Sequence, residues 1–596
     1  DEWQRCCERV KCARGASGLA LFLDAFRKKL LYIGRTVLHP ESAGVAEAWG
    51  VHVTAMPHGF TTEGMLKAAA DVVPEEWKEF QRLAVEEWTP ETTEILVNVV
   101  EWLEKTSASD PGASAMDWDA RKFHQLMKKH RHQRKKQFSL LTEPEDRLVA
   151  RFIVLKKINL WIRDRILPFC DMTTLRSTSF GQSASKARSL LFTQLKLTRF
   201  NEIVEETFTD DEGNIELNRN LQMNCNQCDV DGDKMLFAQA SKKAENIGVG
   251  AFRSRGGSFN RPLVISYIGE DGIDQGGLYR DFLDHCASEL MSKKLPLLIP
   301  TQNNVNNSGE NREMWTVSPQ PLTAATRRMF FFLGRLMGIC VRTDDVIPVS
   351  LSRMTWKLLV DDEPNLADLA LVDFAAAESA RQLQDVQSFG LSAEDFQASF
   401  GDIRFVYHNS LGVEVPLVEG GADKQVTLEN VKRFAQLVLE MRVQEAAEQI
   451  ACIRAGLATV VPIGCMSLWS WRDIEFRVCG DPQISVRVLR SHSHYEGLTE
   501  SDDTVRFMWE ALESFTQPDL QNFIRFCWGR SRLPPEGSSH WGDGFKIGGA
   551  SDIPEEGLPR AHTCFFQIDL PPYRSREIAA DRILFAIRNC VSILNA

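Results

Sequence analysis

The chain has no apolar run long enough to cross a membrane. Its longest apolar segment, Met329 to Val341, is interrupted by Arg335 and is shorter than the roughly 20 residues that a membrane-spanning helix needs. The N-terminus also lacks a basic leader followed by an apolar core. We therefore expect no membrane span. Because the first residue is Asp1 rather than Met, we expect the sequence to be a piece of a longer chain.

The chain also lacks an excess of positive charge. It contains 69 Lys and Arg against 81 Asp and Glu, which gives a net charge of -12. Recognition of nucleic-acid phosphates requires clustered Lys and Arg, so we do not expect a nucleic-acid partner. The one basic run, Lys128 to Lys136, either docks an acidic partner or nucleic acid or is a solvated helix face or linker. The second interpretation is the usual one for such runs.

The 14 cysteines show no dense, regular spacing of the kind that a disulfide framework requires. Their scatter favours a reducing compartment, the cytoplasm or the nucleus. Cys225 and Cys228 form a CxxC pair without a second pair nearby, and the following Asp229 to Asp233 has a misplaced glycine and no closing Glu for a calcium loop. We interpret both as surface loop and expect neither a metal nor an organic cofactor.

A length of 596 residues, 43% of them apolar, predicts three or four folded units. Apolar residues recur at spacings of three and four through the first part of the chain, which is typical of helices. We predict a helical region of unknown role over 1–142, with a linker near 107–137. A helical extension is predicted over 143–242, with a helix from about Glu143 to Ile166 that ends before Pro168.

The pattern changes at Arg261, where a buried strand is predicted over 263–268, followed by a glycine-rich turn and a helix from Leu278. The turn has neither GxGxxG spacing nor a Gly-Lys-Ser/Thr ending, which argues against a nucleotide site. Long helices are predicted over 329–340 and 431–457. Beyond the Gly-Asp-Pro at 480–482 we predict strands near 484–488, 545–547 and 565–570 and helices over 504–515, 518–528 and 575–589.

Three ordered segments resemble one known family. Leu558 to Tyr573, with the sequence LPRAHTCFFQIDLPPY, closely resembles the active-cysteine segment of the HECT family of ubiquitin ligases. The similarity extends to Phe526–Pro534 and to Gly272–Phe282. It implies an α+β, bilobal catalytic domain, with a large, mainly helical N-lobe over 243–479 and a small α/β C-lobe over 483–596. The hinge between them would be Gly480, Asp481 and Pro482.

The resemblance also implies an activity and its partners. Family members accept ubiquitin from an E2 conjugating enzyme as a thioester and transfer it to lysines of protein substrates, and the matching nucleophile here is Cys564. One thiolate displaces another at nearly equal energy, so the acyl group can move to cysteine without ATP. His562, Thr563 and Asp569 are candidates for supporting the reaction. His562 either polarises the thiol or is a turn residue, and Asp569 either orients or deprotonates the incoming lysine or simply faces solvent.

If 565–570 is a strand, Phe566, Ile568 and Leu570 share its core face and Phe565 lies on the other face, available to ubiquitin. Two positions depart from the family pattern. The family often has Asn where this chain has Phe566, and it often uses a Phe four residues from the C-terminus, where this chain has Ile593. Transfer is therefore expected to be slower or differently arranged.

In the family, the E2 docks on an apolar groove of a small N-lobe subdomain. By similarity this subdomain falls near 366–405 and also includes Phe434, and our candidates are Leu383, Ile403 and Phe434. All three are equally interpretable as ordinary core residues.

Two other functions remain open at this point. A cysteine hydrolase acting on ubiquitin or another acyl substrate would also need a cysteine and a histidine, and the sequence does not show which of the 12 histidines approaches Cys564. The third interpretation is a helical scaffold with an inactive cysteine segment. The ordered landmarks favour the ligase.

Overall fold

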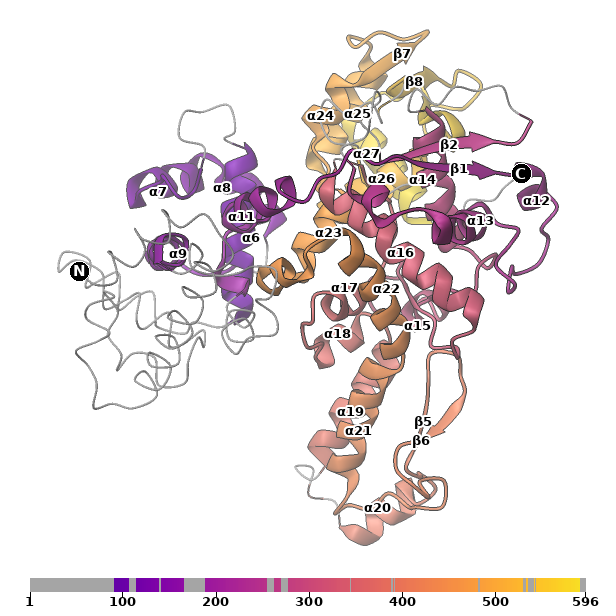
Figure 1. Ribbon diagram of the computed structural model, residues 1–596. Helices are drawn as coiled ribbons and strands as arrows, with labels where there is room; N and C mark the ends of the chain where they lie inside the picture. The colour runs from indigo at the N-terminus through magenta and orange to yellow at the C-terminus, as the bar shows by residue number, and fades with distance from the viewer. Residues whose placement is uncertain are drawn as a thin grey trace, which may run out of the picture. The chain divides into compact units, whose positions relative to one another are not determined.

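The computed structural model (Figure 1) has an α+β fold in which helices predominate and the strands form small sheets. It describes residues 90–106, 114–138, 141–165, 188–254, 262–269, 277–343, 345–386, 390, 392–480, 483–528, 532–533, 541 and 543–589. The chain divides into two compact units, which are considered separately. The first comprises 1–203 and 462–470, and the second comprises 204–461 and 471–596. Within the described ranges, no helix combines the length and apolar character that crossing a bilayer requires.

The first unit is helical where it is described, and most of the helical region predicted over 1–142 lies outside the described residues. Its helices are α6 (Pro90–Thr106), α7 (Ala120–Lys129), α8 (Arg131–Gln137), α9 (Glu145–Arg165), the short η5 (Arg188–Leu190) and α11 (Thr193–Glu205). The rings of Phe123 and Phe152 stack at 4.0 Å in its core. Most of the basic run is exposed on α7 and α8, but Arg134 is buried and pairs with Glu145 at 2.9 Å. Part of this run therefore serves the packing of the unit.

The second unit begins with a mixed segment. It contains β1 (Gly213–Leu217), α12 (Arg219–Met223), α13 (Leu236–Lys243), β2 (Leu263–Tyr267), α14 (Gly277–Leu290), β3 (Leu298–Pro300), α15 (Gln302–Val305) and β4 (Trp315–Val317). Strands β1 and β2 pair in parallel, and β3 and β4 pair antiparallel. The predicted strand and helix on either side of the glycine turn are confirmed, whereas the turn at 270–276 lies outside the described residues.

Strand β2 is not buried on both faces, which corrects the sequence-based expectation. Leu263, Ile265 and Tyr267 are buried, but Val264 between them is 36% exposed. Helix α14 contacts β2, and α13 contacts the neighbouring β1, so one face of the pair receives a helical cover. An apolar run in the sequence does not reveal whether a second layer covers the strand.

The loop at 225–233 is more buried than the predicted surface loop. Cys225 is buried, and the buried carboxylate of Asp229 accepts hydrogen bonds from the backbone N–H groups of Gly232, Asp233, Lys234 and Met235 at 2.8–3.2 Å. Asp229 thus organises the chain that leads into α13. Within the described ranges, no three His, Cys, Asp or Glu side chains gather as they would around a metal ion.

Glu289 of α14 gives the second unit an expected pH dependence. Its carboxylate accepts hydrogen bonds from the backbone N–H groups of Leu236 and Phe237 at 2.9 and 2.8 Å. Burial raises the pKa of Glu289 from 4.5 to about 7, although these hydrogen bonds act to lower it. The folded state then binds more protons than the unfolded state between these two values. We expect stability to be greatest below pH 4.5 with respect to this group, and to fall as the pH rises through about 7.

Urea unfolding from pH 4.5 to 8 would measure this slope, and Glu289→Gln should flatten it. The variant should also lose ~1–2 kcal/mol throughout, because its amide turns a donor toward a backbone N–H. An identical slope in both proteins would contradict the assignment.

The centre of the second unit is the close pair α16 (Ala324–Arg342) and α22 (Ala447–Val460) (Figure 1). A Cβ on Gly334 would lie 1.9 Å from the Ile453 carbonyl oxygen, and one on Gly456 would lie 1.9 Å from that of Phe331. Only glycine permits this approach. The helix predicted over 329–340 is confirmed. The single helix predicted over 431–457 is wrong: α21 (Val431–Gln444) ends first, and the backbone at Ala446 leaves the helical region before α22 begins.

Three arginines spaced seven residues apart on α16 bind the segment 204–253. Arg328 donates to the Gly232 carbonyl at 2.8 Å, and Arg335 donates to that of Ala244 at 3.1 Å. Arg342 donates to Thr207 Oγ1 and to the Val460 carbonyl, both at 2.9 Å. These bonds make residues 204–253 part of the same compact unit as α16. The predicted domain boundaries near 142 and 242 stay predictions.

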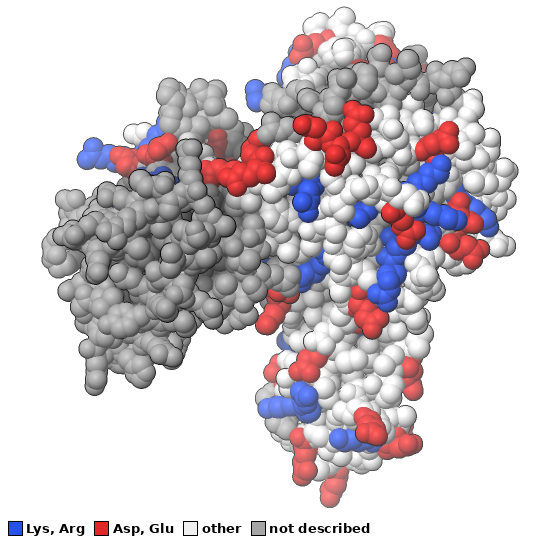
Figure 2. Space-filling model, in the orientation of Figure 1, with Lys and Arg blue, Asp and Glu red and all other residues white. Residues whose placement is uncertain are grey.

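The remaining helices and strands before residue 480 are α17 (Arg353–Leu359), α18 (Leu366–Ala370), α19 (Phe374–Asp385), α20 (Ala393–Phe400), β5 (Val406–His408), β6 (Glu414–Pro416) and α23 (Trp471–Cys479). Elements α19 to α21 enclose a core of their own, which includes Phe396, Phe405, Val431 and Phe434. Figure 2 shows that acidic and basic side chains are mixed on the described part of the face in view.

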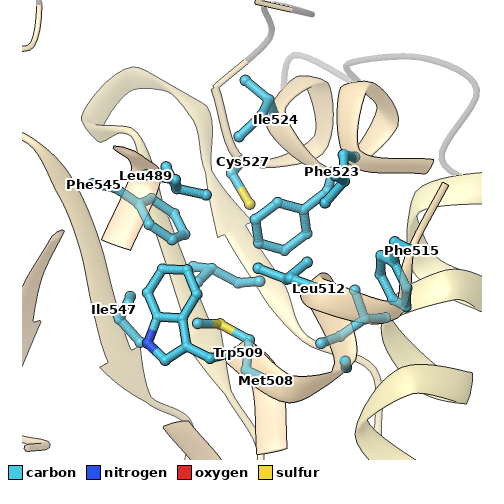
Figure 3. Packing of buried hydrophobic residues seen from close by; sticks show 14 of the residues in the cluster. Leu489, Met508, Trp509, Leu512, Phe515, Phe523, Ile524, Cys527, Phe545 and Ile547 are labelled. Carbon is cyan, nitrogen blue, oxygen red and sulfur yellow. The ribbon is translucent and has the colours of Figure 1, made fainter. Parts of the chain in front are cut away.

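Residues after 483 form a separate hydrophobic core (Figure 3). They fold into α24 (Val486–Ser491), β7 (Ser493–Glu496), α25 (Asp503–Ser514), α26 (Gln517–Trp528), β8 (Phe545–Gly549), β9 (Arg560–His562), β10 (Gln567–Leu570) and α27 (Arg576–Asn589). The strands form one sheet in the order β7-β8-β10-β9. The three predicted helices are confirmed. The strand predicted near 484–488 is wrong, because the Ser485 side chain accepts the Val488 N–H and begins α24.

Candidate active site

Cys564 lies at the tip of an antiparallel hairpin. Strands β9 and β10 pair with Gln567 opposite His562, and four residues connect them. Thr563 to Phe565 form a single 3₁₀ turn, η11, with Cys564 in its middle, and Phe566 then takes a left-handed conformation with φ 48°. The sequence therefore places Cys564 at the end of the sheet rather than within a strand.

His562 and Asp569 are brought together on one face of this hairpin. His562 Nε2 lies 2.8 Å from Asp569 Oδ2, and the side-chain amide of Gln567 donates to Asp569 Oδ1 at 2.9 Å. Gln567 lies opposite His562, and Asp569 is two residues further along the same face. A Cβ on Gly548 of the adjacent β8 would lie 2.6 Å from Asp569 Oδ1, so the glycine leaves room for the carboxylate.

Sequence reasoning did not identify Gln567 or Gly548. Nothing in the one-dimensional pattern signalled them, because their role depends on the register of three strands. The structure leaves Asp569 mostly covered rather than facing solvent, and His562 remains partly exposed. Both oxygens of Asp569 therefore have a partner within the hairpin.

The strand predicted over 565–570 begins two residues later than expected, at Gln567, because Phe566 has a positive φ. The predicted faces are nevertheless confirmed: Phe566, Ile568 and Leu570 are buried in the core, and Phe565 is 64% exposed. Phe565 thus presents an apolar ring to solvent next to Cys564.

Several other thiols are held in the protonated form. Burial raises the pKa of Cys286, Cys340 and Cys527 well above the usual value, and it raises that of Cys479 to about 12. Figure 3 shows Cys527 within the C-terminal core, next to Phe523 and Ile524. A thiolate is the nucleophilic form, so these four cysteines are poor nucleophiles at neutral pH.

The three candidates for E2 docking belong to one cluster, that of α19 to α21. Phe434 is buried and packs edge-on against Phe405, with ring centroids 5.5 Å apart, whereas Leu383 and Ile403 are only partly buried at its border. Phe434 therefore contributes mainly to the core, and the other two retain accessible apolar surface.

At the predicted hinge, Gly480 has φ +82°, and its N–H donates to the Phe476 carbonyl at 2.9 Å. Arg532, from the segment after α26, donates to the Gly480 carbonyl and pairs with Glu475 at 2.6 Å. Asp481 and Pro482 lie outside the described residues, as does Ile593.

Known proteins match this chain over most of its length. A family model for the HECT domain (ubiquitin-transferase) matches residues 284–594. The human E3 ubiquitin-protein ligase HERC2 is 30% identical over 440 residues, which cover 72% of this chain and 9% of that protein. The human probable E3 ubiquitin-protein ligase HECTD4 is 27% identical over 486 residues, 75% of this chain and 12% of that protein.

A third relative is the E3 ubiquitin-protein ligase RSP5 of Chaetomium thermophilum, 28% identical over 333 residues, 54% of this chain and 39% of that protein. The chain thus spans about a tenth of the length of HERC2 and HECTD4. The match to HERC2 covers more of the chain than residues 284–594 contain, so part of the segment before 284 is shared as well. The resemblance noted in the sequence is confirmed, and the chain belongs to the HECT-domain family of ubiquitin transferases.

Proposed function

We propose that this chain is an E3 ubiquitin transferase that accepts ubiquitin from a charged E2 as a thioester on Cys564 and passes it to a lysine of a protein substrate. The observation that carries the proposal is the hairpin tip: Cys564 lies in its turn, and His562, two residues earlier, is bonded to Asp569. Family membership supplies the reaction class, and the high pKa of Cys286, Cys340, Cys479 and Cys527 argues against these four thiols as the nucleophile.

In the first step, the sulfur of Cys564 attacks the E2 thioester, the E2 thiolate leaves, and the proton of Cys564 must go to a base. Asp569 orients His562 through Nε2, which leaves Nδ1 as the other ring nitrogen for proton exchange. In the second step, a lysine amine attacks the new thioester, the Cys564 thiolate leaves, and the amine loses a proton as the isopeptide bond forms. Thr563 lies within the same turn, and Phe565 offers the exposed ring for contact with ubiquitin.

For E2 recruitment we propose the border of the α19 to α21 cluster, with Leu383 and Ile403 as surface contacts and Phe434 as their support. For the architecture we propose two lobes, 243–479 and 483–596, joined at Gly480. The separate hydrophobic core of the residues after 483 and the conformation of Gly480 support this arrangement. The unpaired thiols favour the cytoplasm or the nucleus.

A cysteine hydrolase is the second candidate, because such enzymes also use a cysteine together with a bonded His–Asp pair, and here His562 precedes Cys564 by two residues. Incubation with ubiquitin-charged E2 separates the functions. The ligase should give a ubiquitin adduct on this chain that a thiol reductant removes. A hydrolase would release free ubiquitin without an adduct, and a scaffold would leave the charged E2 unchanged.

The hinge leads to a further expectation. A proline at Gly480 would remove the bond to Phe476 and cannot adopt φ +82°, so it would distort the resting structure itself. Gly480→Ala is the milder test, since only Val346 lies near the added Cβ, at 3.5 Å. We expect a loss of ~1–2 kcal/mol of stability and a slower rate in at least one transfer step. Unchanged rates in both single-turnover steps would show that no hinge motion is required.

A further inference from the structure

Phe566 has a backbone conformation that its side chain disfavours. It lies at φ 48° and ψ 57°, in the left-handed region. Among the described residues, the other non-glycine positions with positive φ are Asn307, Asn311 and Asp361, the residue types that tolerate this region. Phe566 is therefore the exception, and something outside the local backbone must hold it there.

Aromatic packing holds Phe566 in this conformation. The Phe566 ring is 4% exposed and stacks on Trp528 of α26, with centroids 4.2 Å apart and planes inclined by 16°. Phe545 of β8 covers it at 4.9 Å, and the Phe566 carbonyl accepts the Lys546 N–H at 2.9 Å. The ring and the carbonyl are thus fixed by two elements outside the hairpin.

The left-handed residue determines how the hairpin closes. It ends the 3₁₀ turn and directs Gln567 into register with His562, so that His562 and Asp569 share a face. It also directs the Phe566 ring inward while Phe565 stays outside. A different conformation at 566 would shift the register, and a shift by one residue moves every side chain of β10 to the opposite face.

We propose that Phe566, clamped by Trp528, is a positioning residue that fixes the Cys564 turn relative to the His562–Asp569 pair. The proposal rests on the proposed function, in which Cys564 carries ubiquitin. Phe566 acts through its own backbone conformation. Its stacked ring holds the left-handed conformation, which asparagine would adopt more readily.

Phe566→Asn and Phe566→Val form a matched pair for the test. Both remove the ring, but asparagine tolerates positive φ and valine does not. We expect the single-turnover rate of ubiquitin transfer from E2 at saturation to fall roughly tenfold for valine and to stay within about threefold of the parent for asparagine. The E2 concentration at half-saturation should not change. Equal rates for the two variants, whether both impaired or both normal, would overturn the proposal.

Trp528→Leu keeps Phe566 and removes its stacking partner, so it tests the clamp even where a variant at 566 folds poorly. We expect it to behave like the valine variant, and parent-like transfer would refute the clamp. Phe507→Leu is the control, because this half-buried ring packs on the same core but lies beside Arg506. It should leave the transfer rate unchanged.

A readout without ubiquitin separates this inference from the proposed function. The rate of iodoacetamide alkylation at Cys564, followed across pH by peptide mass spectrometry on the full chain, should drop for valine and for Trp528→Leu but not for asparagine. If the parent forms no ubiquitin adduct, the proposed function fails, but the alkylation rates of the variants still test the role of Phe566 in the turn. Equal alkylation rates in the parent and all three variants would overturn the positioning role.

Discussion

Replacing Cys564 with alanine is expected to abolish the reducible ubiquitin adduct completely and to reduce transfer to lysine to background. The proposed thioester requires the sulfur of Cys564, which alanine lacks. The turn that carries Cys564 is exposed to solvent at Phe565, so the substitution should leave the fold intact. Non-reducing and reducing gels after incubation with charged E2 measure the adduct, and circular dichroism checks the fold.

Cys564→Ser extends the same experiment. Serine should form an oxygen ester that survives thiol reductant, and its aminolysis should be slow because an alkoxide is a poorer leaving group than a thiolate. Cys228→Ala is the matched control, since Cys228 is an exposed thiol far along the chain from the hairpin. It should form the adduct normally. An adduct that persists in Cys564→Ala would identify another cysteine as the carrier.

Replacing Arg442 with methionine is expected to destabilise the second unit by ~3–5 kcal/mol. Arg442 is 2% exposed at the end of α21, and it donates to Asp373 at 2.8 Å and to Glu445 at 2.9 Å. It also donates to Ser410 Oγ at 2.8 Å. Methionine would leave the largely buried carboxylates of Asp373 and Glu445 without their counter-charge, and such a loss costs far more than an exposed ion pair contributes.

The network also has a geometric role. Asp373 caps α19 by accepting the Ala376 N–H, and Ser410 lies between β5 and β6. Arg442 therefore ties the start of α19 and the β5–β6 loop to the end of α21. We have proposed that the E2 docks on the border of this cluster. The loss of Arg442 should therefore also slow ubiquitin transfer onto Cys564.

Urea unfolding of Arg442→Met and Arg433→Met would measure the difference. Arg433 lies on the same helix and pairs with Glu440 at 3.4 Å, but both side chains are exposed, so its loss should cost less than ~1 kcal/mol. Equal effects of the two substitutions would show that the buried network is not a major source of stability.

Much of the secondary structure could be predicted from the sequence. The helices α16, α25, α26 and α27 follow from apolar residues at spacings of three and four, which is a local property. The predictions of secondary structure were wrong where capping or packing contacts overrode the local sequence pattern. Ile484 to Val488 alternates like a strand, but the cap at Ser485 begins a helix. The run over 431–457 is interrupted at Ala446, because α21 packs on α19 whereas α22 packs on α16.

For the candidate site, too, some features follow from the sequence and others only from the tertiary structure. The sequence by itself determined the family and the candidates Cys564, His562 and Asp569, because motif residues keep their order and spacing along the chain. Only the tertiary structure decided that His562 bonds to Asp569, that Gly548 leaves room for that carboxylate, and that Trp528 holds Phe566 in a left-handed turn. These contacts join segments up to 38 residues apart, and their geometry depends on strand register and ring packing, which no local pattern encodes.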